Sequence, residues 1–210
     1  AIPAGKVLEI GEAPGALAVI QDKRMIRHAA QGRDDKAPTS GPDEVEYMGQ
    51  AVALVVAETF EAARHAAQNI AVRCKPEAVP VDPEAVTPEF PPKKQSAAGN
   101  VDKAMRKAAF TVDQVWHTPS QMSAAMEPHA AIAEWDGNQV TIRAALQMLS
   151  SNRKQMADAL GIKEKNLRLL APYVGGGFGS KLGINAEAVA AAIAARQLGR
   201  PVQVSMTRYQ

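Results

Sequence analysis

A glycine-rich loop between a predicted strand and a predicted helix constrains this chain most strongly. Residues 175–179 read Gly-Gly-Gly-Phe-Gly, and Ser180 and Lys181 follow directly. Because glycine lacks a Cβ, such a loop lets the backbone approach a ligand closely and aim several N–H groups at one point. The pattern favours an anionic or oxygen-rich ligand, and a tight turn without a ligand is the alternative.

Two common nucleotide-binding loops fit this sequence poorly. A phosphate-binding P-loop has a glycine before its lysine and a hydroxyl residue after it, whereas Lys181 stands between Ser180 and Leu182. A dinucleotide-binding fingerprint aligned on Gly175 and Gly177 needs a third glycine where Ser180 stands, and no ribose-binding acid follows at the expected distance. A nucleotide-binding βαβ unit is therefore the weakest of the interpretations.

The segments around the loop predict a mixture of strands and helices. A hairpin with the turn Asp136-Gly137-Asn138 precedes a helix that Ser151 caps and Gly161 ends. On the second hairpin strand Gln147 is expected at the end of the more polar face, opposite Val140, Ile142, Ala144 and Leu146. The predicted strands are 131–135, 139–143, 167–170 and 202–206, and the predicted helices are 152–160 and 185–198.

The first part of the chain predicts a smaller unit of the same kind. Strands are expected at 15–20, 51–57 and 70–74, a loop at 21–44, and a helix at 60–71 that begins after the capping residue Thr59. Prolines at 80, 83, 88, 91 and 92 predict a stiff connector. We therefore expect an α+β (mixed α/β) chain with a domain at 1–82, a proline-rich linker at 83–100 and a domain at 101–210.

Composition narrows the classes of function. The 210 residues include 24 Lys and Arg against 22 Asp and Glu, giving a net charge of +2, and the aromatic content is only 4%. This balance favours neither nucleic-acid binding nor disorder, and no apolar run approaches the length of a membrane span. The single cysteine, Cys74, excludes an internal disulfide, a CxxC pair and a cysteine-ligated iron-sulfur cluster built from this chain alone. The opening Ala-Ile-Pro-Ala-Gly-Lys lacks the features of a signal peptide, so we expect the chain to begin within a longer protein.

Few other side chains suggest chemistry by themselves. Glu127-Pro128-His129 pairs a carboxylate with an imidazole, but no second cluster completes a metal site, so direct metal ligation is not expected. The isolated His28, His65 and His117 and the strand residue Cys74 are interpreted as structural. Met122 and Met126 are expected in the core or lining a pocket.

Four separate motifs, taken in order, resemble one family. They are Tyr-Met-Gly-Gln followed by the apolar run 51–57, the segment Met-Glu-Pro-His at 126–129, Leu146-Gln147, and the loop from Gly175 to Lys181. This set resembles the molybdenum-binding large subunit of the xanthine oxidase and aldehyde oxidoreductase family, most of all its bacterial periplasmic aldehyde oxidoreductases. The resemblance implies a truncated a/b hammerhead domain followed by the first part of the molybdenum cofactor-binding domain.

The resemblance also implies roles for individual residues. Gln147 would donate a hydrogen bond to the oxo ligand of molybdenum or to a nearby cofactor oxygen, and Met148 would follow it along the pterin. Backbone N–H groups around Gly177, Phe178 and Gly179 would hold the other side of the cofactor. The side chain of Phe178 would form part of the wall of the substrate cavity. Xanthine-specific members have a glutamate where this chain has Leu182, which favours an apolar aldehyde. The family's catalytic glutamate base is expected downstream of residue 210.

The activity implied is oxidation of aldehydes or aromatic heterocycles with water-derived oxygen. The implied cofactor is molybdopterin cytosine dinucleotide, with [2Fe–2S] clusters and FAD on partner subunits. The implied partners are the remainder of the large subunit, the iron-sulfur and FAD subunits and a small aldehyde. The resemblance implies that the protein is located in the periplasm, with the cytoplasm as the alternative. We expect the 210-residue chain alone to be inactive, and a structural or docking module without cofactor is the alternative.

Overall fold

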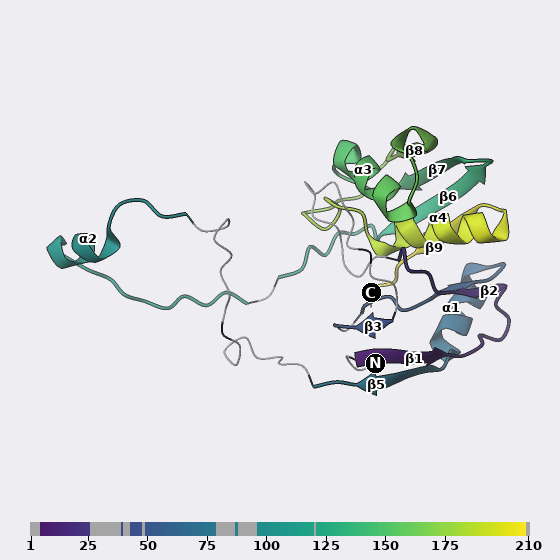
Figure 1. Ribbon diagram of the computed structural model, residues 1–210, viewed down its shortest axis with the longest axis horizontal. Coiled ribbons are helices and arrows are strands. Elements are labelled where there is room, and N and C mark those ends of the chain that lie inside the picture. The colour runs from purple at the N-terminus through teal and green to yellow at the C-terminus, as the bar shows by residue number, and fades with distance from the viewer. Residues whose placement is uncertain are drawn as a thin grey trace. The chain divides into compact units, whose positions relative to one another are not determined.

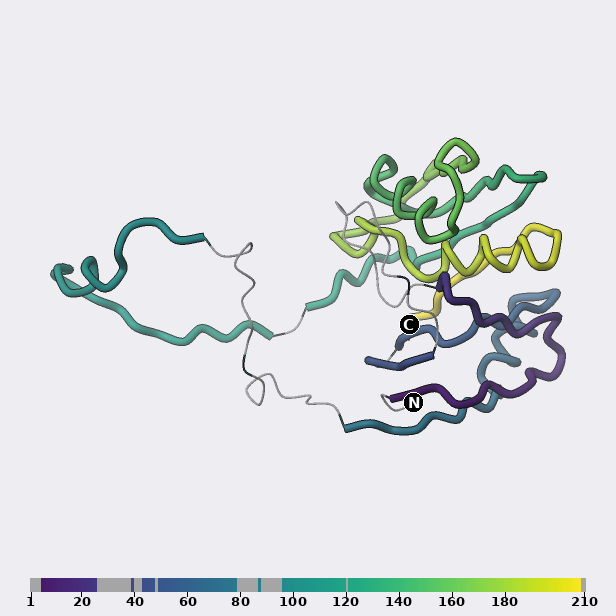
Figure 2. Tube along the Cα trace, in the orientation of Figure 1, coloured from purple at the N-terminus to yellow at the C-terminus, as the bar shows by residue number. Residues whose placement is uncertain are grey.

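A computed structural model describes residues 5–25, 39, 43–47, 49–78, 87, 96–119 and 121–208 (Figure 2). Residues 1–78 together with 123–210 form one compact unit, and residues 79–122 form a second. Most of the predicted 21–44 loop, most of the predicted 83–100 linker and His28 lie outside the described residues. The predicted domain boundaries therefore stay a prediction.

A four-stranded sheet in the order β8-β7-β6-β9 carries the glycine loop (Figure 1). Strands β6 (Ala130–Asp136) and β7 (Gln139–Ala144) form the predicted antiparallel hairpin, with β9 (Val202–Ser205) antiparallel to β6 and β8 (Leu167–Leu170) parallel to β7. Gly137 takes φ +53° in the hairpin turn, a conformation that glycine adopts without strain. The mixed α/β class is confirmed.

One face of this sheet forms the core beneath two helices. The side chains of Val140 and Ile142 are fully buried, as is Ala133 opposite Ile142, whereas Arg143 on the other face is exposed. Helix α4 (Ala186–Leu198) packs on β6 and β9, and α3 (Leu149–Leu160) packs on β8 and α4. The predicted alternation along the second hairpin strand is thereby confirmed.

Most of the buried side chains of helix α4 are small. Six alanines of the helix are buried (Ala188, Ala190, Ala191, Ala192, Ala194 and Ala195). The indole Nε1 of Trp135 on β6 donates to the carbonyl oxygen of Ala192 at 2.8 Å, and the guanidinium of Arg196 lies 4.7 Å from the centre of the same ring. Asn185 and Gly199 stand at the two ends of the helix, close to the predicted bounds.

The prediction for the start of α3 was wrong. The helix begins at Leu149, so Ser151 lies within its first turn, and Met148 is the N-cap residue. The side-chain Oδ1 of Asn152 accepts from the backbone N–H of Met148 at 3.1 Å, which supplies a local bond without the predicted serine cap. At the other end Gly161 takes φ +67° and ends the helix as expected. The short 3-10 helix η3 (Glu164–Asn166) then leads into β8.

The first part of the chain contains two small antiparallel sheets. Strand β1 (Gly5–Ile10) pairs with β3 (Glu44–Val45) and β5 (Val72–Pro76), while β2 (Ala18–Ile20) pairs with β4 (Leu54–Val56). Helix α1 (Phe60–Asn69) lies between β4 and β5 in the chain, and the hydroxyl of Thr59 accepts from the N–H of Ala62 as predicted. The β-α-β order is confirmed, but β4 and β5 belong to different sheets.

The second unit contains α2 (Val101–Lys107), whose N-cap residue Asn100 accepts from the backbone N–H of Lys103 at 2.8 Å. Every described residue from 101 to 119 is exposed, including Phe110 and Trp116. This helix therefore owes its form to its cap and its local sequence rather than to burial of a side chain.

Two isoleucines on the hairpin provide a matched test of where the core lies. Ile142 is fully buried, whereas Ile132 on the neighbouring strand is 38% exposed. Replacing Ile142 by alanine should lower the free energy of unfolding by about 2–5 kcal/mol, because the emptied volume lies in a packed core. Ile132→Ala should cost clearly less in the same chemical denaturation experiment. Equal losses in the two variants would contradict this assignment of the buried face.

Candidate functional site

The glycine loop lies between β8 and α4 and has an unusual backbone. Gly176 and Gly179 adopt φ +91° and +99°, and Phe178 between them adopts φ +48°, a region that side chains other than glycine rarely enter. The hydroxyl and the backbone N–H of Ser180 both donate to the carbonyl oxygen of Gly177, at 2.8 and 2.9 Å. These bonds close a tight turn that presents Phe178, which is 78% exposed, on the surface of the unit.

The structure brings Gln147 against this loop. The backbone N–H of Gln147 donates to the carbonyl oxygen of Lys181 at 2.9 Å. A Cβ on Gly177 would lie 2.5 Å from the side-chain Cδ of Gln147, so only glycine fits at that position without displacing the amide. Gln147 follows the end of β7 by three residues rather than ending the strand as predicted, because β7 is hydrogen-bonded only as far as Ala144. Two of the predicted site elements, far apart in sequence, therefore meet.

The loop offers hydrogen-bond donors that no described residue uses. Within the described part of the chain, the backbone N–H groups of Gly177, Phe178 and Gly179 have no hydrogen-bond acceptor. The side chain of Gln147, which is exposed, adds an amide that carries two further donors without adding charge. This donor set fits an oxygen-rich group such as a molybdenum cofactor.

A buried lysine holds the loop at its base. Lys181 is fully buried, and its ammonium donates to the side-chain Oε2 of Glu127 at 2.6 Å and to the Glu127 carbonyl oxygen at 3.1 Å. The same Oε2 accepts the backbone N–H of Gly175 at 2.7 Å. Glu127 thus links the lysine after the loop to the first glycine within it, and a Cβ on Gly175 would lie 2.5 Å from the Cβ of Glu127.

The charge of Glu127 is stabilised by these contacts. The hydrogen bond from Lys181 lowers the pKa of the Glu127 carboxyl below its ordinary value, with smaller contributions from the Gly175 N–H and from the charge of His129. Burial raises this pKa, but the hydrogen bond outweighs it. The ionised Glu127 therefore stabilises the folded chain at any pH above the ordinary pKa of a glutamate. This stabilisation is lost as the pH falls through the lowered pKa, because the carboxylate becomes protonated.

His129 also belongs to this arrangement. Its ring Nε2 lies 3.2 Å from the carbonyl oxygen of Ser180, which also accepts the side-chain amide of Asn185 at 3.2 Å. The sequence analysis did not assign the Glu127–Lys181 pair, because its members lie far apart in sequence. Two features of the sequence could have suggested the pair. One is the lysine that follows the glycine loop, and the other is the Glu-Pro-His segment, whose carboxylate had no assigned partner.

A polar network behind α3 fixes the segment around Leu182. The buried Asn152 donates from Nδ2 to the carbonyl oxygen of Leu182 at 2.8 Å and to the side chain of Gln155 at 3.2 Å. Gln155 in turn accepts the backbone N–H of Ile184 at 3.3 Å. Because Asn152 also bonds Met148, the network joins two of the predicted site residues, Met148 and Leu182.

The two methionines before the Glu-Pro-His segment are not in the core of the chain, so the core alternative for them was wrong. Met122 is 88% exposed and Met126 is 90% exposed. The nearby Ala125 is buried, and the guanidinium of Arg208 donates to the carbonyl oxygens of Ala125 and Met126 at 2.6 and 2.5 Å. These backbone contacts, together with a bond from Ser123 Oγ to the Phe178 carbonyl oxygen at 2.9 Å, hold the segment against the loop.

A buried carboxyl group lies in the first turn of α4. Glu187 is 2% exposed, and its Oε2 is a buried side-chain oxygen without a hydrogen-bond partner among the described residues. Burial raises the pKa of Glu187 to about 7, against smaller lowering effects of a backbone N–H and of the Lys181 charge. The sequence analysis did not single out this residue, because a glutamate in a first helical turn is ordinarily an exposed partner of the helix dipole.

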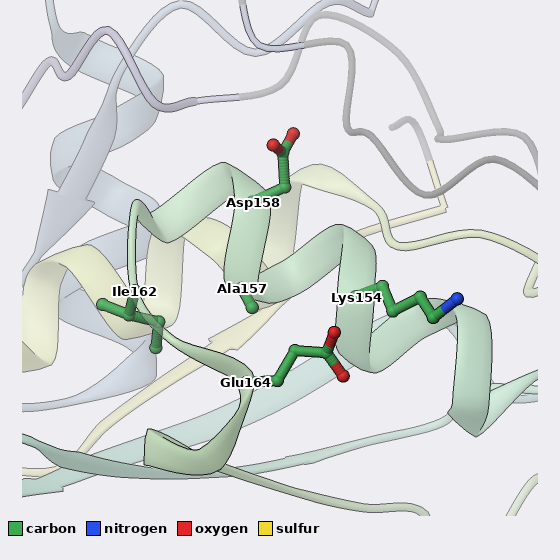
Figure 3. Close-up of a pocket in the computed structure, with 5 residues that line it drawn as sticks. All are labelled: Lys154, Ala157, Asp158, Ile162 and Glu164. Carbon is green, nitrogen blue, oxygen red and sulfur yellow. The ribbon is translucent and has the colours of Figure 1, made fainter.

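Surface depressions lie elsewhere and offer less chemistry. A depression of about 400 Å³ on α3 is lined by Lys154, Ala157, Asp158, Ile162 and Glu164, none of which belongs to the glycine loop (Figure 3). The three charged side chains point in different directions rather than toward one centre. The candidate site is therefore the loop, where Gln147 lies against Gly177. Across the described residues, no three His, Cys, Asp or Glu side chains gather as metal ligands, and no helix is long and apolar enough to cross a membrane.

The contact between Gly177 and Gln147 predicts a rescue experiment. Gly177→Ala should lower the free energy of unfolding by only about 0.5–1 kcal/mol, because the new methyl group overlaps the end of the exposed Gln147 side chain, which can rotate toward solvent. The double variant Gly177→Ala with Gln147→Ala should recover most of that loss, since the overlapping amide is gone. Thermal unfolding of the single and double variants measures both effects. Gly11→Ala is the control, because a Cβ there meets its nearest atom at 3.4 Å, and a loss that Gln147→Ala does not relieve would contradict the contact.

The buried carboxyl of Glu187 predicts a pH dependence of stability. Its pKa is about 7 in the folded chain and about 4.5 when unfolded, so the unfolded state releases this proton first as the pH rises. Stability should therefore fall between about pH 4.5 and pH 7, by on the order of 3 kcal/mol from this group. Glu187→Gln should flatten the curve measured by denaturant unfolding, whereas Glu164→Gln at an exposed carboxylate should leave its shape unchanged.

Comparison with known proteins agrees with this geometry. The family model described as the molybdopterin cofactor-binding domain matches residues 84–210. The aldehyde oxidoreductase molybdenum-binding subunit PaoC of Escherichia coli (strain K12) is 40% identical over 205 residues, covering 94% of this chain and 27% of PaoC. The 6-hydroxypseudooxynicotine dehydrogenase complex subunit gamma of Paenarthrobacter nicotinovorans is 31% identical over 188 residues, covering 84% of this chain and 24% of that protein. The chain thus spans about a quarter of the length of these relatives.

Solved structures share the fold. The aldehyde oxidoreductase from Desulfovibrio gigas superimposes with a TM-score of 0.78 at 21% identity, covering 99% of this chain and 26% of that one. The quinoline 2-oxidoreductase from Pseudomonas putida 86 gives a TM-score of 0.73 at 22% identity, covering 98% and 30%. With the glycine loop, the adjoining glutamine and the matched domain taken together, this chain belongs to the molybdenum hydroxylase family and carries part of its molybdopterin cofactor-binding domain.

Proposed function

We propose that the protein carrying this chain oxidises aldehydes at a molybdenum cofactor that the glycine loop and Gln147 help to hold. The observation that carries the proposal is the meeting of Gln147 with Gly177 beside three backbone N–H groups that have no acceptor within the described residues. When bound, the molybdenum cofactor supplies the oxidation of the substrate with oxygen derived from water.

The residues of this chain would bind and orient the cofactor rather than react themselves. Gln147 would donate from its side-chain amide, and the N–H groups of Gly177, Phe178 and Gly179 would donate from the facing side. Met148 would lie along the pterin, with its backbone fixed by Asn152. The general base belongs to another part of the protein, so the 210 residues alone would be inactive.

The substrate surface next to the loop is apolar, which supports an aldehyde without a strongly polar recognition group. Phe178 is 78% exposed and Leu182 is 39% exposed, and neither carries a hydrogen-bonding side chain. The relative PaoC is named as an aldehyde oxidoreductase subunit. Aromatic heterocycles are the second substrate class, which the named relation to a 6-hydroxypseudooxynicotine dehydrogenase complex supports.

Electrons would leave through partner subunits. A single cysteine cannot hold a cysteine-ligated iron-sulfur cluster within this chain, and the relatives are named as subunits. We therefore propose an iron-sulfur subunit, an FAD subunit and the remainder of the large subunit as partners, with the cofactor in its cytosine dinucleotide form. The periplasm is the proposed compartment, and cell fractionation distinguishes it from the cytoplasm.

The test is a metal and activity assay on the protein purified with the polypeptides it retains. Molybdenum near one atom per chain, cytosine nucleotide released on denaturation and aldehyde-dependent dye reduction are the expected results. Gln147→Ala should lower molybdenum retention or turnover by about 10- to 100-fold, as expected when a supporting contact to a metal group is lost.

Gln203→Ala is the matched control, since Gln203 is an exposed glutamine on β9 outside the loop, and it should behave as the unmodified protein does. Absence of molybdenum from every preparation would contradict the proposal and favour a structural or docking module. Turnover by the 210-residue chain alone would contradict the placement of the base elsewhere.

A further inference from the structure

We propose that Ser123 is a positioning residue of the glycine loop, whose hydroxyl group fixes the peptide between Phe178 and Gly179 so that the Gly179 N–H can donate to the cofactor from one direction. The inference rests on the proposed function, because it takes this loop as the one that holds the cofactor. Ser123 is partly buried and lies 55 residues before Phe178 in the chain. Its hydroxyl is not among the groups proposed to touch the cofactor.

The hydrogen bond from Ser123 acts on the same peptide unit that carries the Gly179 N–H. The Ser123 hydroxyl donates to the carbonyl oxygen of Phe178 at 2.9 Å. None of the described peptide bonds is cis, and in a planar trans peptide the C=O and N–H groups point in opposite directions. The bond to the Phe178 carbonyl oxygen therefore also sets the direction of the Gly179 N–H, which points away from Ser123.

The preceding peptide unit of the loop is fixed by a different serine. The carbonyl oxygen of Gly177 accepts the hydroxyl and the backbone N–H of Ser180, at 2.8 and 2.9 Å. By the same geometry, these two bonds set the direction of the Phe178 N–H. Two neighbouring donors of the loop thus depend on two different hydroxyl groups, and loss of either hydroxyl should affect its own donor.

Phe178 requires such a restraint because its backbone is strained. Its φ of +48° lies in a region that residues other than glycine rarely adopt, and a conformation of this kind persists only where the surrounding structure enforces it. The side chain of Phe178 is 78% exposed, so burial of the ring contributes little to that restraint. The bond from Ser123 acts directly on the strained residue.

The segment that carries Ser123 is itself held in place. The guanidinium of Arg208 donates to the carbonyl oxygens of Ala125 and Met126, at 2.6 and 2.5 Å, and the side chain of Ala125 is buried. The next residue, Glu127, accepts the backbone N–H of the first loop glycine at 2.7 Å. A hydroxyl presented from a segment with these contacts can hold a peptide in one orientation, as a supporting group must.

A crystal structure of the variant without cofactor tests the anchor by itself. The full-length protein is purified, with the subunits that it retains, from a host that cannot make the cofactor. In Ser123→Ala the peptide between Phe178 and Gly179 should adopt more than one orientation, while the peptide between Gly177 and Phe178 keeps its own. Ser123→Thr retains a hydroxyl and should keep a single orientation at both peptides.

Hydrogen exchange resolved to single amides tests the effect on the cofactor site. In the cofactor-loaded protein, the Phe178 and Gly179 amides should be better protected than in the cofactor-free protein. Ser123→Ala should lower the protection of Gly179 at least about fivefold, the factor expected for loss of one neutral hydrogen bond, and leave that of Phe178 unchanged. Ser180→Ala should show the opposite pattern. Ser205→Ala on β9 is the matched control and should change neither amide.

The outcomes separate the anchor from the proposed function. An unchanged peptide orientation in cofactor-free Ser123→Ala would overturn the proposal, as would equal losses of protection at Phe178 and Gly179, which indicate general loosening. If Ser123→Ala does not retain the cofactor, its cofactor-free structure still decides. If instead the proposed function is wrong, the unmodified protein should contain no molybdenum and neither amide should gain protection, while the peptide orientation would still depend on Ser123.

Discussion

The ion pair between Lys181 and Glu127 is the constraint on which the candidate site depends. It is formed by a fully buried ammonium and a partly exposed carboxylate at 2.6 Å. Glu127, which precedes β6, also accepts the backbone N–H of Gly175, so the pair links that segment to the glycine loop. Burying such a charge without a partner would cost several kcal/mol, so a fold that buries Lys181 must also bring Glu127 to it. Through the bond from the Gly175 N–H to the same carboxylate, the pair also fixes the start of the glycine loop.

Much of the architecture was predictable because local patterns determine it. The alternation of Val140 and Ile142 with polar residues, the Gly137 turn, and Gly161 at the end of α3 are all short-range signals, and the structure confirms them. Where the prediction failed, a tertiary contact decided the outcome. Helix α3 begins before Ser151 because Asn152 bonds Met148 and Leu182, a pairing that no local pattern specifies.

The site was predictable in its parts but not in its connections. The glycine loop and Gln147 attracted attention as motifs, and the structure places Gln147 against Gly177. Glu127, Lys181 and Glu187 were missed as a group, because each residue has an ordinary role when it is viewed alone. Burial is a property of the folded arrangement, so only the structure shows that Lys181 and Glu187 are buried and that Lys181 pairs with the partly exposed Glu127.

The alanines of α4 carry a consequence for variation in this family. A helix whose buried residues are mostly alanine has little slack where it packs on a sheet, since few long side chains separate the two backbones. An added methylene at Ala191 or Ala194 would thus lift the whole helix rather than be absorbed where it is introduced. Because the loop and Glu187 lie at the N-terminal end of that helix, sites two turns away from any ligand should be as intolerant of larger residues as the loop itself.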